Sequence, residues 1–149
     1  MYYPDLMPYR RATGGNVPGV LNIGWLDDSH DYPIGNVPDT VISKLKQLLL
    51  ENRDVNKVGT IKGCPFCGVD VVYVPSTDAR KLLGMSEIWI PSKSGTIYAA
   101  PSLLYHYITK HEYRPPQEFL TAVEEFDVAA DVNLQKLYDN TVNGPAPQV

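Results

Sequence analysis

Two short motifs with the chemistry of metal ligands constrain this chain more than any other feature. They read C-x2-C and, after a gap of 38 residues, H-x4-H, and they comprise Cys64, Cys67, His106 and His111. They include both cysteines of the 149-residue chain and two of its three histidines. Two thiolates and two imidazoles complete a tetrahedral shell for Zn2+, and such a closed shell is typical of a metal that stabilises a fold. The motifs therefore predict a structural zinc site.

The residues around the motifs favour the same interpretation. Glycines flank the cysteine pair, and Gly68 can adopt the positive φ that a tight turn around a thiolate sulfur needs. On an ideal helix, His106 and His111 would point about 140° apart. We therefore expect the last helical turn before Pro115 to tighten or unwind. The order of knuckle, strands and histidine helix resembles a Cys2His2 zinc finger of ββα order, with a much longer insert.

Other interpretations of the cysteine pair remain open at this stage. A Cys-Pro-Phe-Cys segment also resembles the redox motif of glutaredoxins, in which a helix begins at the first cysteine and activates its thiolate. Here a glycine and a β-branched run follow, and the redox interpretation leaves both histidines unexplained. A catalytic zinc with one protein ligand displaced, or a cluster without metal, are the remaining alternatives.

The pattern of elements predicts an α+β fold, in which a small β-hairpin or sheet with the zinc knuckle packs against three to four helices. The length suits one domain with a substantial core and is short for two. The expected strands are residues 69–74, 86–91 and 95–99, the last two forming a hairpin. The expected helices are residues 38–52, a second that Ser102 caps, a third from Pro116, and a weaker fourth at 127–138, with one helical turn around 79–83.

Turn-forming residues suggest how the chain is divided. The 13 prolines and 11 glycines are frequent near the N-terminus, so residues 1–37 are expected to form an extended, turn-rich arm that belongs to the domain. Its apolar stretch, residues 20–26, is either a short strand or a docked segment. Residues 38–140 are expected to form the zinc-stabilised α+β domain, and residues 141–149 a disordered tail.

A second candidate site lies in the segment WLDDSHDY, residues 25–32. Asp27, Asp28 and His30 suit a hydrolytic site in which the histidine acts as a base and an aspartate orients it. The alternative is a loop in which aspartates cap turns. Nothing else in the sequence supplies an identifiable nucleophile with a partner. Such a loop is also a possible recognition surface.

Composition limits the partners and the location. The net charge of −4 gives no general attraction to phosphate backbones, so nucleic acid is an unfavoured partner. No signal peptide and no apolar run of membrane-spanning length is visible, which predicts a cytoplasmic protein with no membrane association. The ten tyrosines suit a partly buried core or a protein interface. We therefore expect the partner to be another protein.

Several stretches resemble a family of small uncharacterised bacterial proteins. They are GMSEIWI (residues 84–90), GTIYAAPSLLYHYI (95–108) and HEYRPPQEF (111–119), together with an upstream Cys-x-x-Cys and the segment NIGWLD (22–27). The resemblance covers about residues 20–125 and implies a bacterial origin and a shared fold, but no reaction. The favoured hypothesis is a zinc-stabilised protein-interaction module. The alternatives are a small hydrolase that uses Asp27, Asp28 and His30 and, less favoured, a nucleic-acid-binding zinc-finger-like module.

Overall fold

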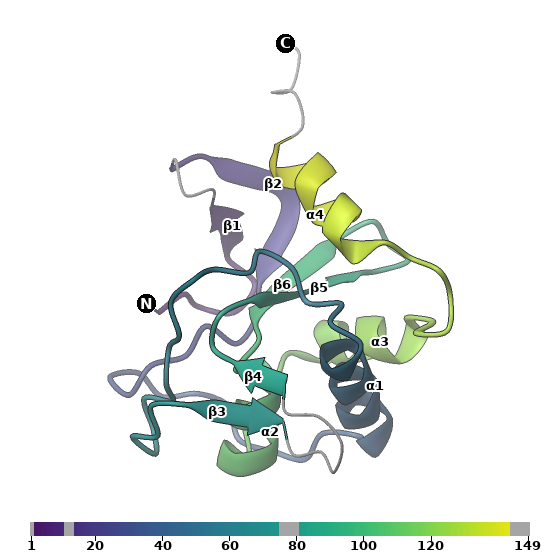
Figure 1. Cartoon of the computed structure of the whole chain (residues 1–149). Coiled ribbons are helices and arrows are strands. Elements are labelled where there is room, and N and C mark those ends of the chain that lie inside the picture. Colours follow the sequence, from purple (N-terminus) through teal and green to yellow (C-terminus); the bar gives the residue numbers. More distant parts are fainter. Residues whose placement is uncertain (1, 11–13, 75–80, 144–149) are drawn as a thin grey trace.

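The computed structural model describes residues 2–10, 14–74 and 81–143, and the fold is α+β (Figure 1). The N-terminal elements are β1 (Pro8–Arg10), β2 (Asn16–Asn22) and α1 (Asp39–Leu50). The middle of the chain forms β3 (Val72–Val74), β4 (Lys81–Leu83), β5 (Glu87–Pro91) and β6 (Ile97–Pro101). Three helices follow: α2 (Leu104–His111), α3 (Gln117–Glu125) and α4 (Leu134–Val142).

The main sheet combines strands from the N-terminal part and the middle of the chain. Its strand order is β1-β2-β6-β5, and β5 and β6 form the predicted antiparallel hairpin, with Trp89 opposite Ala99. Strand β2 pairs parallel with β6, from Val20 opposite Ile97 onward. The segment expected as an extended arm therefore contributes two of the four strands, and the apolar stretch within it is partly a strand, which ends at Asn22.

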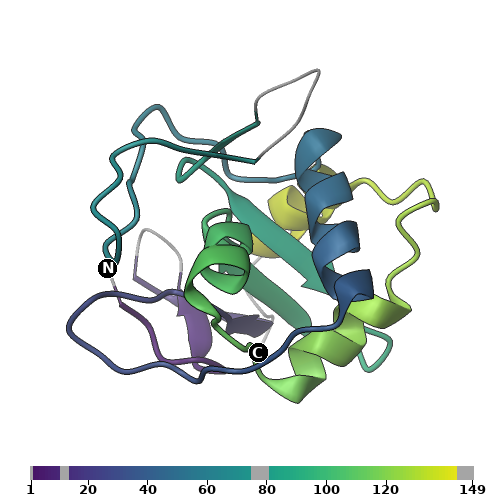
Figure 2. The same ribbon diagram turned by 90° about the horizontal axis from the view of Figure 1, so that it is seen from below.

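Helices cover the main sheet on both sides. In Figure 1, α4 lies above the sheet and α1, α2 and α3 lie below it, and Figure 2 shows α2 in front of the strands with α4 behind them. Strand β5 is accordingly buried at four successive residues, because side chains of both faces meet a packed layer. Trp89 is fully buried and makes edge-to-face contacts with Tyr9 and, from α4, Tyr138.

Two predicted elements differ in the structure because their backbone groups have other partners. The expected strand at residues 69–74 is shorter, since the Val69 carbonyl accepts a hydrogen bond from the Cys64 N–H and closes the knuckle. The helical turn expected around residues 79–83 is wrong for residues 81–83, which form β4 against β3. Its other residues lie outside the described part of the chain.

The start of α2 also differs from the prediction. Ser102 does not cap α2, because its Oγ accepts a hydrogen bond from the Gly84 N–H at 2.9 Å.

The fourth helix begins later than expected, at Leu134, after Asn133 as its N-cap. The Asn133 side chain accepts from the Lys136 N–H at 2.9 Å. The preceding residues form an irregular segment, because the guanidinium of Arg53, which lies shortly after α1, binds three carbonyls of that segment instead. These belong to Val128, Ala130 and Val132, at 2.8, 3.5 and 3.1 Å.

Replacing Arg53 with alanine is expected to lower the free energy of unfolding by about 1–3 kcal/mol, because three carbonyls lose a charged donor. Gln47→Ala is a suitable control, since Gln47 lies on the exposed side of α1 and its side chain donates to the exposed Glu51. Urea denaturation of the two variants checks the prediction. Equal stability of both would mean that the Arg53 contacts contribute nothing.

Helix α4 is the last element of the described chain. Helix α4 continues to Val142, beyond the expected end of the domain at residue 140, and the rest of the predicted tail, residues 144–149, lies outside the described residues. None of the described helices is long and apolar enough to cross a membrane.

Candidate metal centre

The structure brings the four predicted ligand residues together. One donor atom from each of Cys64, Cys67, His106 and His111 lies within 4.8 Å of the other three. The Cys64 Sγ is 3.3 Å from the His111 Nε2, and the Cys67 Sγ is 3.5 Å from the His106 Nε2. The two Nε2 atoms are 3.3 Å apart. Such a convergence of two thiols and two imidazoles is a possible metal site.

Local backbone geometry explains how the cysteine loop reaches this point. The Cys64 N–H donates to the Val69 carbonyl at 2.9 Å, and the Gly68 N–H donates to the Cys64 carbonyl at 3.2 Å. Gly68 has a φ of +69°, as the sequence suggested for the turn. At Gly63, a Cβ atom would collide with the Val69 carbonyl oxygen, so glycine is required where the two arms of the loop approach.

The end of helix α2 places the second candidate histidine at the site. His111 is the last residue of α2, and helical geometry continues up to it. Glu112 then adopts the left-handed conformation with a φ of 57°, and the N–H groups of Glu112 and Tyr113 both donate to the Tyr107 carbonyl. The helix therefore ends directly after its second candidate ligand. These two bonds span five and six residues instead of the four of an ideal α-helix, so the turn that ends α2 at His111 is wider than ideal.

Burial and neighbouring charges set the protonation of these groups. Burial raises the pKa of the Cys64 thiol, whereas hydrogen bonds from the backbone N–H groups of Cys67 and Phe66 act in the opposite direction. Burial lowers the pKa of both His106 and His111, and the nearby Lys110 lowers each further. The imidazoles are therefore held in the neutral form, which is the form that binds a metal ion.

An aromatic cluster supports the site from one side. The Phe66 ring, between the two cysteines, lies 5.3 Å from the His111 ring and 5.6 Å from Tyr107. Tyr32 packs against Phe66 at 5.0 Å and donates its hydroxyl to the His111 carbonyl at 3.0 Å. Sequence reasoning missed these roles. The position of Phe66 inside the C-x2-C motif was an available signal, whereas nothing local connects Tyr32 to the histidine helix.

The second candidate site is a local arrangement on the surface. The His30 Nδ1 lies 2.7 Å from an Asp27 carboxylate oxygen, and this hydrogen bond lowers the pKa of Asp27. The same oxygen accepts from the Ser29 N–H, as expected for an aspartate that caps a turn. The His30 side chain is 50% exposed and its ring stacks on Tyr2. Asp28 is exposed, and no described contact joins it to the pair.

The redox interpretation of the cysteines lacks the structural feature that it requires. A turn and a loop follow Cys64, and the next described helix after it is α2, which begins at Leu104. Neither thiol therefore lies at a helix N-terminus, where the positive end of the dipole would activate a thiolate. Cys64 is buried and Cys67 is exposed, and both are free.

Fold and site together define the class of protein: an α+β domain with a Cys2His2 cluster that can hold a metal ion. A family model matches residues 1–124, and the chain belongs to that family, which is described as a domain of unknown function (DUF7919). No curated protein and no solved structure shows a significant match to the chain.

Proposed function

We propose that this chain is a zinc-stabilised domain that works as an interaction module for another protein. The observation that carries the first half is the close approach of four donor atoms from two thiols and two imidazoles. An ion held by all four has no coordination position left for a substrate or an activated water. Its contribution is then to the stability and shape of the surrounding surface.

The distances within the cluster support zinc as the ion. A tetrahedral ion with bonds of about 2.0 Å to nitrogen and about 2.3 Å to sulfur separates two nitrogens by about 3.3 Å and a nitrogen from a sulfur by about 3.5 Å. The cluster has 3.3 Å between its nitrogens and 3.3 and 3.5 Å between its nitrogen–sulfur pairs. Three of the six donor pairs therefore already have separations close to those around a tetrahedral ion, and all four donor atoms lie within 4.8 Å of one another.

An exposed apolar strand next to the knuckle supports the second half of the proposal. Val71 and Tyr73 are 40% and 45% exposed, while the alternate residues Val72 and Val74 are buried. Val69 is also exposed, so apolar side chains continue from the knuckle into β3. We call Val69, Val71 and Tyr73 the knuckle strand surface. The metal site lies directly before this surface in the chain, and an ion bound there would hold its first residues.

An extended segment of a partner protein is the occupant that this surface suits. Strands β3 and β4 form a two-stranded sheet with no further strand partner among the described residues. An added strand would use backbone hydrogen bonds along such an edge and place alternate apolar side chains against the exposed face. The net charge of −4 makes a phosphate backbone a poor occupant of the same surface.

The test is site-specific cross-linking followed by reconstitution. A photo-cross-linking amino acid at position 73 is expected to capture one specific protein in cells, whereas the same probe at Val132, an exposed apolar residue before α4, should not. With the captured protein purified, the double variant Val71→Lys, Tyr73→Lys should weaken binding about tenfold or more, and Val132→Lys should leave it unchanged.

Binding of nucleic acid is the outcome that would contradict the proposal of a protein partner. Duplex and single-stranded oligonucleotides are titrated into the zinc-loaded protein at low and moderate salt. Tight binding that weakens steeply with salt would reject the protein-partner proposal, because counterion release is the signature of phosphate contacts.

A further inference from the structure

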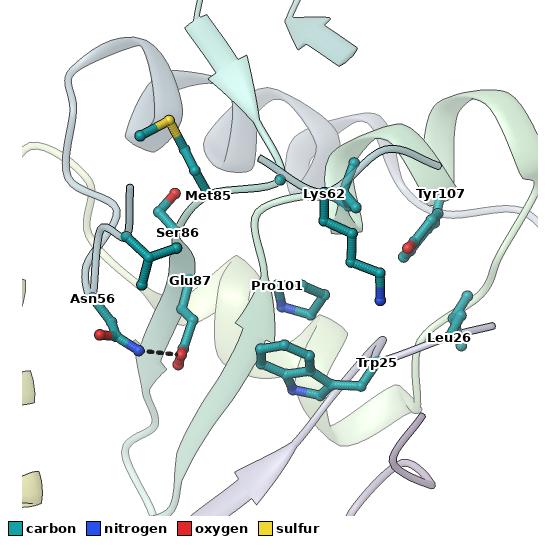
Figure 3. A pocket seen from close by; sticks show the side chains of 12 residues that line it. Trp25, Leu26, Asn56, Lys62, Met85, Ser86, Glu87, Pro101 and Tyr107 are labelled. Atoms are coloured by element: carbon teal, nitrogen blue, oxygen red, sulfur yellow. Dashed lines mark hydrogen bonds between the residues drawn. The ribbon is translucent and has the colours of Figure 1, made fainter. Parts of the chain in front are cut away.

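A pocket with two adjoining chambers lies beside the metal centre. The inner chamber has a volume of about 140 Å³ and the outer one about 400 Å³. Trp25, Asn56, Lys62 and Glu87 line both chambers, so the two spaces adjoin, and both are open to solvent. Figure 3 shows the Lys62 side chain extending towards the space between Trp25, Pro101 and Tyr107. An exposed basic side chain therefore borders a largely apolar pocket.

The inner chamber is lined mainly by apolar side chains around one oriented aromatic ring. The Trp25 indole donates its Nε1–H to the Ala99 carbonyl at 3.0 Å, which fixes the orientation of the ring. Further lining residues are Leu26, Val58, Met85, Pro101 and Leu103. An apolar cavity of about 150 Å³ is large enough for a benzene molecule. The inner chamber therefore has the size and the lining for one six-membered ring.

The polar groups of the pocket differ in whether they are already paired. The buried Glu87 carboxylate accepts hydrogen bonds from Tyr9, Asn56 and Trp89, at 3.1, 2.6 and 2.9 Å. None of the ion pairs within the described part of the chain involves the Lys62 ammonium. Arg10 adds a second positive charge in the outer chamber, where its guanidinium donates to the Gly14 carbonyl. The charge that lacks a partner is therefore positive.

We propose that this pocket binds a small organic carboxylate with a single-ring apolar body. The ring occupies the inner chamber against Trp25, and the carboxylate pairs with Lys62 at the junction of the two chambers. Ligand sites of this kind are mostly apolar with a few placed polar groups. The proposal does not depend on a protein partner for the knuckle strand surface.

Two residues that line the pocket are neighbours of candidate metal ligands in the chain. Lys62 precedes Cys64 by two residues, and its N–H donates to the Gly84 carbonyl at 2.8 Å. Tyr107 is the neighbour of His106 on α2. Because both walls adjoin candidate ligand residues in the chain, the experiment uses the zinc-loaded full chain.

The Trp25 Nε1–H proton provides a direct reporter, because it lies at the pocket and is hydrogen-bonded. Its NMR resonance is identified from the spectrum of Trp25→Phe. Titration with 3-phenylpropionate is expected to shift this resonance saturably. The neutral 3-phenylpropionamide should bind about tenfold more weakly, and inorganic phosphate should not bind, because it lacks the ring.

A matched pair of lysine variants tests the role assigned to the charge. Lys62→Met keeps the apolar stem and is expected to weaken binding of the carboxylate about tenfold while leaving binding of the amide unchanged. Lys93→Met, in the β5–β6 turn, should behave as the unchanged protein. Zinc content and thermal unfolding show whether each variant is folded. Equal affinity for carboxylate and amide, or no shift of the Trp25 resonance at millimolar 3-phenylpropionate, overturns the proposal.

Discussion

Replacing Cys64 with serine or His106 with alanine is expected to remove zinc from the protein and to unfold most of it. The unchanged protein should contain about one zinc per chain if the four residues form one closed shell. Structural zinc sites supply about 10–16 kcal/mol in small zinc-finger peptides, which is comparable to the whole stability of a typical domain. Elemental analysis gives the zinc content, and circular dichroism with thermal unfolding gives the loss of structure.

The remaining histidine supplies the control for this experiment. His30 is exposed, bonds to Asp27 and is not one of the four clustered residues. His30→Ala should therefore keep both zinc and stability. A chelator that removes zinc from the unchanged protein should reproduce the effect of Cys64→Ser. Protein purified without chelators that contains no transition metal would contradict the prediction.

Replacing Gly84 with alanine is expected to lower the free energy of unfolding by about 3 kcal/mol or more. Gly84 has a φ of +92°, which is strained for any residue with a side chain. An added Cβ atom would also collide with the carbonyl oxygen of Lys62, which is backbone and cannot move aside as a side chain would. Because Lys62 leads into the cysteine loop, the collision should also reduce zinc affinity.

Gly95 separates the two causes of this loss. Its φ of +95° is nearly that of Gly84, but no atom lies within 4 Å of the position that its Cβ would occupy. Gly95→Ala should therefore show the cost of backbone strain alone, about 1–3 kcal/mol, and should leave zinc affinity unchanged. Chemical denaturation and zinc competition assays compare the two variants. Equal losses at both positions would show that the contact with Lys62 is unimportant.

Features that depend on neighbouring residues were predictable from the sequence. The β5–β6 hairpin follows from two alternating runs around a short polar loop, and α1 and α3 follow from apolar residues at helical spacing. The clustering of Cys64, Cys67, His106 and His111 was also predictable, because a tetrahedral metal site uses both residue pairs.

Features that depend on distant contacts were not predictable in the same way. The parallel pairing of β2 with β6 leaves no local mark in a segment that contains Pro18 and Gly19. The late start of α4 depends on Arg53, which binds carbonyls that a local pattern assigns to a helix. The support of His111 by Tyr32 likewise joins residues that only the fold brings together.

The position of β2 between β1 and β6 has a consequence for synthesis of the chain. Val20 leaves the ribosome well before Ile97, its partner in the sheet, has been made. At about 5–20 residues per second, this strand waits roughly 4–15 s before its partner can pair with it. Pro18 and Gly19 disfavour pairing of the waiting strand with other chains. Strand β2 therefore waits for β6 far longer than β5 does, although both pair with the same strand.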